Sequence, residues 1–259
     1  MNAAKLFNIG VFEEDGLLRK QLESGVLVFV FTAAPARTLA TIYADANLTS
    51  KSNPITAASF AADDEIRFWG TAASYDILVV YPADGRWAEL KAATPGDHNV
   101  LLSKFDKERL YVAAATFNNA VETDSGLDLL PGDRVYDVGV LTITADTGET
   151  IDIGLLSTGT GGDADGFAAL TTIASTAYVH STLPVFTVGS SETYVSTAAT
   201  VGILLGRSVV GTDANEDTGI HSMHGYRANG TNTSQVTYTC SSGTDVFAGY
   251  IFLYVRRGY

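Results

Sequence analysis

The apolar residues of this chain come in short bursts, and this pattern limits what the chain can fold into. The bursts are rich in Val, Ile, Tyr, Phe and Thr, and residues of the Gly, Asp, Asn, Ser and Pro types separate them. Such runs are typical of β-strands and turns, whereas long amphipathic helices would need apolar residues every three or four positions over longer stretches. We therefore predict an all-β fold with two β-sandwich or jelly-roll-like domains joined by a short linker.

The strand pattern weakens near the middle of the chain, where Pro95-Gly96-Asp97 is followed by a charged stretch from Lys104 to Arg109. A chain of 259 residues can bury two such cores without disulfides or a structural metal. The predicted division is an N-terminal β domain over 1–93, a linker over 94–108, and a C-terminal β-sandwich or jelly-roll domain over 109–259.

The expected strands follow the apolar bursts. In the first domain they are 26–31, 38–43, 66–69, 75–81 and 86–91, and in the second 110–117, 134–145, 149–156, 177–188, 194–205, 235–240 and 246–256. Asp84-Gly85 predicts a tight hairpin turn, because this pair adopts the positive φ angles that such turns require. Asp146-Thr147-Gly148 predicts a second hairpin. The segment 166–175 has Phe167, Leu170 and Ile173 three apart, and this spacing indicates a short helix.

Charge and cysteine content exclude several classes of function. With 16 basic and 29 acidic side chains the net charge is -13, which would repel a polyphosphate, so nucleic acid is not an expected partner. The single Cys240 cannot form an intrachain disulfide. The first ten residues lack the features of a signal peptide, and no run approaches the roughly 18 apolar residues that span a bilayer. We expect a soluble protein with no membrane partner.

Neither a catalytic group nor a cofactor motif emerges from the sequence. The four histidines, His98, His180, His221 and His224, occur without a Gly-x-Ser-x-Gly nucleophile elbow. The Gly-rich stretches do not match nucleotide-binding patterns. Paired carboxylates from distant strands would leave no spacing signal, so the prediction of a non-enzymatic protein without a cofactor rests on the absence of the other motifs.

Two acidic loops leave calcium binding open. The loop Asp213–Asp217 begins like an EF-hand loop, but its sixth position is Thr218 and its twelfth is His224, where calcium loops have Gly and Glu. The loop Asp163–Asp165 has the same ambiguity. We interpret both loops as surface turns, and the pair His221 and His224 as loop histidines rather than metal ligands.

The last predicted strand is apolar on both faces. A strand in an antiparallel sandwich usually has one solvated face. This strand is therefore either central in a thick core or in contact with another subunit, and residues 200–205 behave similarly. We favour a subunit interface, formed by the alternate residues Val246, Ala248, Tyr250, Phe252 and Tyr254. Other strand aromatics are expected in the core, namely Phe29, Phe31, Tyr43 and Phe68.

Residues 38–90 carry a resemblance to a known class of protein. A strand ends in Tyr43-Ala44-Asp45, Asn53-Pro54 begins an extended segment, and Tyr75-Asp76-Ile77 opens a strand that leads to the turn at Asp84-Gly85. This arrangement resembles a module in virion proteins of tailed bacteriophages. The second half, from Pro131 through Gly162-Asp163 to the aromatic final strand, looks like domains of phage head decoration, or cement, proteins.

The resemblance implies a homotrimer on the capsid surface that binds the major capsid protein and stabilises the head. It also implies that the protein is made in the host cytoplasm and that residues 1–93 are the candidate capsid-docking module. Two other classes stay open. A tail-fibre or receptor-binding protein would present aromatic residues at exposed loop tips, and a secreted adhesin or carbohydrate-binding module would suit the Thr-rich, acidic composition. The strand position of most aromatics and the lack of a signal sequence favour the decoration protein.

Overall fold

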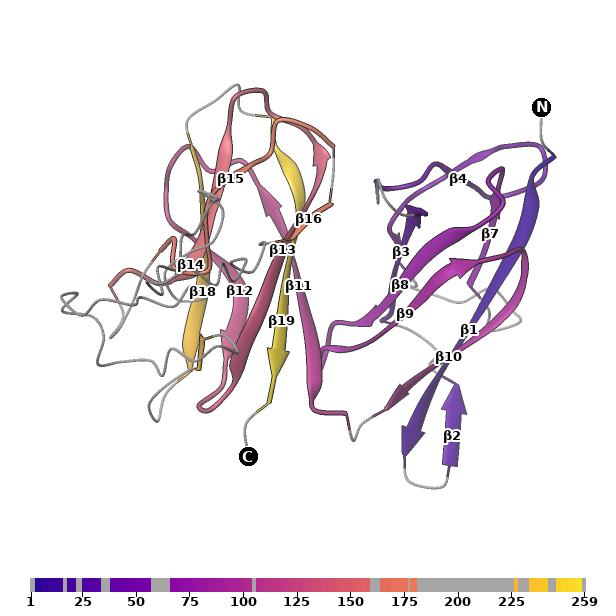
Figure 1. Cartoon of the computed structure of the whole chain (residues 1–259), viewed down its shortest axis with the longest axis horizontal. Helices are drawn as coiled ribbons and strands as arrows, with labels where there is room; N and C mark the ends of the chain where they lie inside the picture. The colour runs from indigo at the N-terminus through magenta and orange to yellow at the C-terminus, as the bar shows by residue number, and fades with distance from the viewer. Residues whose placement is uncertain are drawn as a thin grey trace, which may run out of the picture. The chain divides into compact units, whose positions relative to one another are not determined.

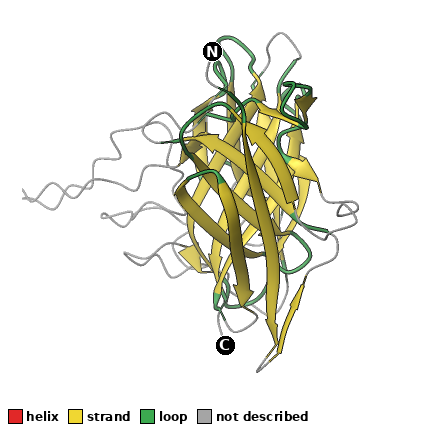
Figure 2. Ribbon diagram, turned by 90° about the vertical axis from the view of Figure 1, so that its right-hand side faces the viewer, coloured by secondary structure: helices red, strands yellow, loops and turns green. Residues whose placement is uncertain are grey.

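The computed structural model describes residues 3–15, 18–21, 25–33, 38–56, 66–103, 106–158, 164–176, 178–180, 226–227, 233–241 and 246–257. These residues form strands and loops, and none of them lies in a helix (Figure 2). The chain divides into two compact units, Met1–Leu110 and Tyr111–Tyr259. The prediction of an all-β fold with sandwich-like domains is confirmed.

Unit 1 is a sandwich of two sheets (Figure 1). The larger sheet has the order β10-β1-β7-β4-β5, with β2 also paired to β1, and the smaller has the order β6-β3-β8-β9. The strands are β1 (Lys5–Asp15), β2 (Leu18–Gln21), β3 (Leu27–Thr32), β4 (Ile42–Tyr43), β5 (Ser50–Lys51), β6 (Ile55–Thr56), β7 (Ile66–Gly70), β8 (Tyr75–Tyr81), β9 (Arg86–Ala93) and β10 (Gly96–Ser103).

The core of unit 1 is filled by alternate residues of facing strands, because successive side chains of a strand point to opposite faces. Phe7 stacks on Phe68 with ring centroids 4.8 Å apart, and both rings meet the edge of Tyr75. The core also contains Ile9, Val11, Val28, Val30, Ile42, Ile77, Val79, Val100 and Leu102. Both sheets therefore contribute to one apolar layer.

The carboxamide of Asn53 bonds to the backbone of β3 and of the segment before β4, which also meet at the bridge between Phe31 and Leu39. Its Oδ1 accepts a hydrogen bond of 3.1 Å from the Val30 amide, and its Nδ2 donates to the carbonyls of Val30 at 2.7 Å and Ala40 at 2.8 Å. Buried backbone groups need such partners, since an unpaired group loses its bond to water without replacement. Asn53 thus fixes its own segment against β3 and the segment before β4.

We predict that Asn53→Ala destabilises unit 1 by about 1–3 kcal/mol, because it leaves partly buried backbone groups without their partner. Urea unfolding followed by tryptophan fluorescence measures the loss. Asn47→Ala, in an exposed turn, is the control and should change stability by less than about 0.5 kcal/mol. Equal midpoints for Asn53→Ala and the wild type would contradict this role.

Unit 2 is a second sandwich. One sheet has the order β11-β19-β13-β16, with β17 also paired to β13, and the other has the order β12-β18-β14-β15. The strands are β11 (Glu108–Thr116), which begins in unit 1, β12 (Thr123–Leu129), β13 (Arg134–Thr144), β14 (Thr150–Leu155), β15 (Ala168–Thr172), β16 (Tyr178–His180), β17 (Tyr226–Arg227), β18 (Ser234–Cys240) and β19 (Ala248–Arg256).

The core of unit 2 follows the same alternation. Val138 and Val140 of β13 and Ile251 and Leu253 of β19 face Ile151 and Ile153 of β14 and Val236 of β18, and Phe167, Phe247 and Cys240 are also members. All of these side chains are fully or almost fully buried. Each unit therefore has an apolar cluster of its own.

The two predicted hairpins have different outcomes. Gly85 has a φ of 72° and its amide donates to the Tyr81 carbonyl at 3.0 Å, so the turn between β8 and β9 is confirmed. Gly148 also has a positive φ, of 85°, in a turn after β13. The strands on either side, β13 and β14, lie in different sheets, however, so the prediction of a hairpin there is wrong. The turn instead carries the chain across the sandwich.

The predicted helix over 166–175 is also wrong. Residues Ala168–Thr172 form β15, which pairs with β14. Phe167 and Ile173 are both fully buried, and their amides donate to the carbonyls of Ile153 and Glu149. Pairing with β14 and the burial of Phe167 and Ile173 stabilise the strand, whereas an isolated helix of this length is only marginally stable in water.

The stretch 94–108, predicted to be a linker, contains a paired strand. β10 runs parallel to β1 over eight registered positions, from Phe7 beside Gly96 to Glu14 beside Ser103. Val100 and Leu102 point into the core, while Leu101 between them is 37% exposed. The structure divides the chain between Leu110 and Tyr111, so residues 96–103 belong to the sheet of unit 1.

Candidate interface on the C-terminal sheet

The strand β19 is central in its sheet, with β11 on one side and β13 on the other. One face packs inward, through Phe247, Gly249, Ile251, Leu253 and Val255, which are all buried. The register with β13 places Leu253 beside Val138 and Ile251 beside Val140. The apolar character of this face is therefore explained by the core of unit 2 alone.

The other face of β19 forms an aromatic cluster with neighbouring strands. Phe252 meets the edge of Tyr178 of β16 with ring centroids 5.0 Å apart, and the hydroxyls of Tyr178 and Tyr254 are 2.7 Å apart in a hydrogen bond. The ring centroids of Tyr136 of β13 and Tyr254 are 6.0 Å apart. Gly139, opposite Phe252, leaves room for these rings, since a Cβ there would come within 2.9 Å of the Tyr178 hydroxyl.

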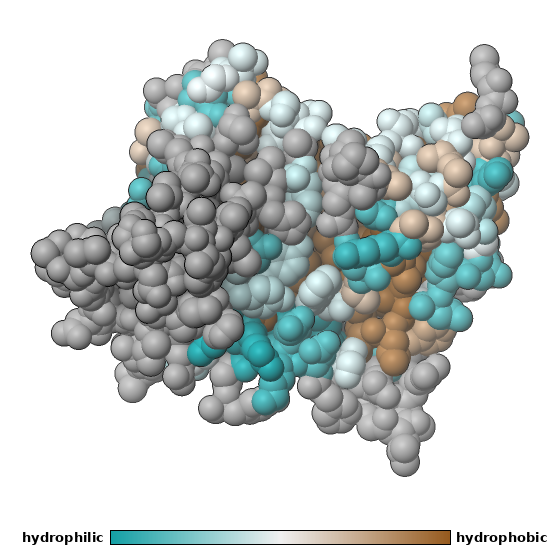
Figure 3. Space-filling view, viewed as in Figure 1, coloured by the Kyte–Doolittle hydropathy of each residue, from teal (hydrophilic) through white to brown (hydrophobic). Residues whose placement is uncertain are grey.

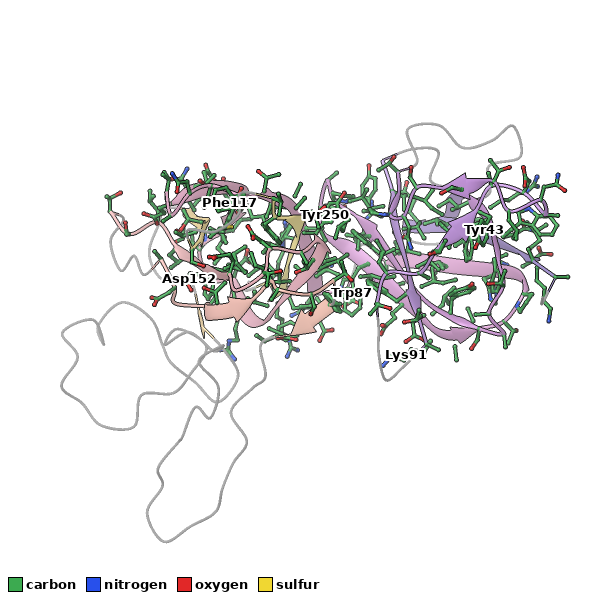
Figure 4. The ribbon with its side chains drawn as sticks, turned by 90° about the horizontal axis from the view of Figure 1, so that it is seen from above. Tyr43, Trp87, Lys91, Phe117, Asp152 and Tyr250 are labelled. Atoms are coloured by element: carbon green, nitrogen blue, oxygen red, sulfur yellow. The ribbon has the colours of Figure 1, made fainter. Side chains whose placement is uncertain are left out.

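The predicted interface residues differ in exposure along this face. Phe252 is 0% exposed and Tyr254 9% exposed within the single chain. Val246 is 48% exposed, and Ala248 and Tyr250 are partly exposed. Tyr250 is labelled in Figure 4. The accessible part of the predicted interface is thus the end of the sheet where β19 begins. Contact with another subunit there stays a prediction.

Ile143 of β13, which the sequence analysis did not select, extends the accessible end. It is 36% exposed and lies at the irregularity of the β13–β19 register next to Thr144, the partner of Ala248. Tyr136 and Tyr178 were also missed as members of the aromatic cluster. Their positions on predicted strands were visible in the sequence, but the strand pairing that brings them to β19 was not.

Backbone hydrogen bonds hold the start of β19 in place. The Val246 amide donates to Oδ2 of the buried Asp146 at 3.4 Å, and the Phe247 carbonyl accepts from the Phe117 amide at 3.0 Å. The Asp146 amide donates in turn to the Ile173 carbonyl. The side chain of Val246 is therefore presented from a fixed backbone.

We predict that Gly249→Ala disrupts this sheet. A Cβ at Gly249 would lie 2.2 Å from the Leu141 carbonyl oxygen, a backbone atom that cannot move without breaking the β13–β19 pairing. The expected loss of stability is at least about 1–3 kcal/mol in urea unfolding. Ala114→Ser, an exposed change on the neighbouring β11, serves as control. A Gly249→Ala protein as stable as the wild type would contradict the register.

The thiol of Cys240 lies in the core below this sheet. Burial raises the pKa of the Cys240 thiol to about 11, and the carboxylates of Asp146, Asp152 and Glu149 add to the shift. Because the thiolate is the reactive form, this thiol is poorly suited to nucleophilic chemistry at neutral pH.

We predict that Cys240 reacts with a disulfide reagent at pH 8 at least about a hundredfold more slowly in the folded protein than in urea, from its thiolate fraction alone. The release of the coloured leaving group measures both rates, and Cys240→Ser gives the blank. Equal rates in the two conditions would show that the thiol is not held in the core.

The other sequence candidates for chemistry are not brought together in the described part of the chain. The Nε2 atom of His98 lies 2.7 Å from the Thr94 carbonyl oxygen, and Asp165 lies in an exposed turn. His180 lies in β16. Asp163, the loop Asp213–Asp217, His221, His224 and residues 200–205 lie outside the described residues. Within the residues that are described, no group of three or more His, Cys, Asp or Glu side chains could hold a metal ion.

The described segments contain no helix that is long and apolar enough to cross a membrane. The described surface carries hydrophilic and apolar residues in both units (Figure 3).

Comparisons with known proteins give structural similarity alone. No protein-family model matches the chain, and no curated protein matches it. Among solved structures, the chain is similar to the VP2 subviral particle of infectious bursal disease virus, with 10% sequence identity and a TM-score of 0.21. The alignment covers 99% of this chain and 56% of the VP2 chain, so this chain spans little more than half of that length. The functional proposal is therefore based on the residues of the chain itself.

Proposed function

We propose that this chain is a non-enzymatic structural protein of a tailed-phage virion, a head decoration protein that binds the major capsid protein on the outer capsid surface as a homotrimer. In this role the protein contributes buried contact area rather than catalysis. Three subunits that bind together gain avidity, because each contact raises the local concentration of the next.

The observation that carries the proposal is the accessible apolar end of the β11-β19-β13 sheet. This end of the sheet carries the accessible side chains of Ile143, Val246, Ala248 and Tyr250. The solvent-facing side of an antiparallel sheet is usually polar. Exposed neighbouring apolar side chains of this kind mark contact sites between proteins. The resemblance of residues 38–90 to virion modules supports the same class.

The charge of the chain also supports a role outside nucleic acid packaging. A net charge of -13 disfavours contact with the genome and favours solubility of free subunits before they bind. Docking would therefore depend on apolar and hydrogen-bonding contacts rather than on a basic patch.

We predict that Val246→Asp prevents self-association. A carboxylate at the centre of an apolar contact loses its water without gaining a partner, which disfavours the assembled state. Light scattering after size exclusion at micromolar concentration should give three times the 27.3 kDa chain mass for the wild type and the single-chain mass for the variant.

Val121→Asp is the matched control, because Val121 is a 61% exposed valine of unit 2 in the turn after β11. It should assemble like the wild type. A wild-type protein that is monomeric, or a Val246→Asp protein that assembles normally, would contradict the proposal. The number of copies in purified virions separates the alternatives. The copy number of a decoration protein rises with the number of capsid subunits, whereas that of a tail fibre does not.

A further inference from the structure

The larger sheet of unit 1 has an outer face that the core does not use. Leu6 of β1, Trp69 of β7 and Tyr43 of β4 are directly opposite one another in the strand register. Residues that are opposite in a sheet point to the same face, so these three side chains form one row across three strands. All three are partly exposed, while their neighbours Phe7, Phe68 and Ile42 are buried in the core.

This finding corrects the expectation that Tyr43 belongs to the core. Tyr43 is partly exposed and lies opposite Trp69 on the outer face of the sheet, and Ile42 occupies the core position instead. Phe29, Phe31 and Phe68 are buried as expected. The argument that strand aromatics serve only as core therefore does not hold for this sheet.

A polar row lies beside the aromatic row. Two residues further along the same strands, Arg67 of β7, Asn8 of β1 and Asp97 of β10 are in register. Asn8 Nδ2 donates a hydrogen bond of 2.5 Å to Asp97 Oδ1, and Arg67 and Asp97 are exposed. Two residues of a strand span about 7 Å, which is close to the width of one sugar ring.

Asn99 of β10 extends the face beyond the polar row. It is exposed and in register with Gly10 of β1. Gly10 itself is buried beneath Asn99 and Phe12, since a Cβ there would lie 3.0 Å from Asn99 Oδ1 and 3.1 Å from the Phe12 ring. The Asn8 oxygen is also buried, so the surface combines flat rings with the carboxamide of Asn99, one guanidinium and one carboxylate.

We propose that this face of unit 1, defined by Leu6, Trp69, Tyr43, Arg67, Asn8, Asp97 and Asn99, binds an uncharged saccharide. The C–H face of a pyranose packs on flat rings, whose faces are electron-rich and whose edges are polar. Its hydroxyls both donate and accept, and they match the Asn99 carboxamide, the Arg67 guanidinium and the Asp97 carboxylate.

Charge and dimensions select this ligand class. Among the seven residues that define the face, the positive charge of Arg67 and the negative charge of Asp97 cancel. These residues therefore offer no net attraction to a polyphosphate or an anionic polymer. Neighbouring strands are about 4.8 Å apart, so the row from Leu6 to Tyr43 spans about 10 Å, the length of about two sugar rings. The inference is independent of the proposed interface, which lies in unit 2.

The test uses the full chain and its two tryptophans, Trp69 and Trp87. In Trp87→Phe, fluorescence reports Trp69 alone. The probes are hexamers of β-1,4-linked glucose, α-1,4-linked glucose and β-1,4-linked N-acetylglucosamine. We expect a saturable change in Trp69 fluorescence with at least one hexamer and a Kd on the order of 1 mM or tighter. Calorimetry should give the same Kd for Trp87→Phe and the wild type.

Variants locate the binding. Trp69→Ala and Tyr43→Ala should each weaken calorimetric affinity at least about tenfold. Asp97→Ala changes an exposed position and should weaken it about threefold to tenfold without loss of stability, which separates binding from folding. The proposal is overturned by the absence of binding with all three hexamers, or by affinities in folded Trp69→Ala and Asp97→Ala that equal the wild-type value.

Discussion

The packing of two sheets against each other is the interaction on which both units of this protein depend. Every strand that contributes to a core places alternate side chains inward, and each fully buried Val, Ile, Leu or Phe contributes about 1.5–3 kcal/mol of apolar burial. The chain has a single cysteine, which is buried, so no disulfide within the chain supplements this packing. Hydrogen bonds from side chains such as Asn53 then complete the ladders where strands end or separate.

The same alternation produces a second face on each sheet, and the candidate sites lie there. In unit 2, neighbouring aromatic rings bury the outer face of β19 at Phe252 and Tyr254, and the face is solvent-exposed near Val246. In unit 1, the outer face carries an aromatic row and a polar row in register. A contact surface for another subunit and a surface for a sugar can coexist because they occupy different sheets of different units.

Local patterns were enough to identify many strands but not their partners. The alternation over Tyr75–Tyr81 predicts β8 with its observed bounds, and Asp84-Gly85 predicts its hairpin. The predicted strands begin at residue 26, so β1 was missed although Phe7, Ile9 and Val11 alternate along it. Its parallel pairing with β10 joins residues about 90 positions apart and leaves no local trace. For the same reason Gly148 indicates a turn without showing that the chain crosses to the other sheet.

The candidate surfaces were harder to predict than the strands. Val246 and Tyr250 follow from a strand that is apolar on both sides, but the burial of Phe252 depends on ring contacts from β16, which no spacing reveals. Trp69 and Tyr43 meet because three strands align in register, and a single short strand such as β4 does not indicate which of its faces is inward.

The central claim is that each unit is stabilised by an apolar core of its own. Tryptophan fluorescence reports unit 1, which holds both tryptophans, and the exposure of the Cys240 thiol reports unit 2. Ile77→Ala and Ile251→Ala each remove a fully buried side chain, from unit 1 and unit 2 respectively, and should cost about 2–5 kcal/mol. Urea unfolding should then show that Ile77→Ala lowers only the fluorescence midpoint and Ile251→Ala only the thiol midpoint. Equal shifts of both midpoints in both variants would contradict the account.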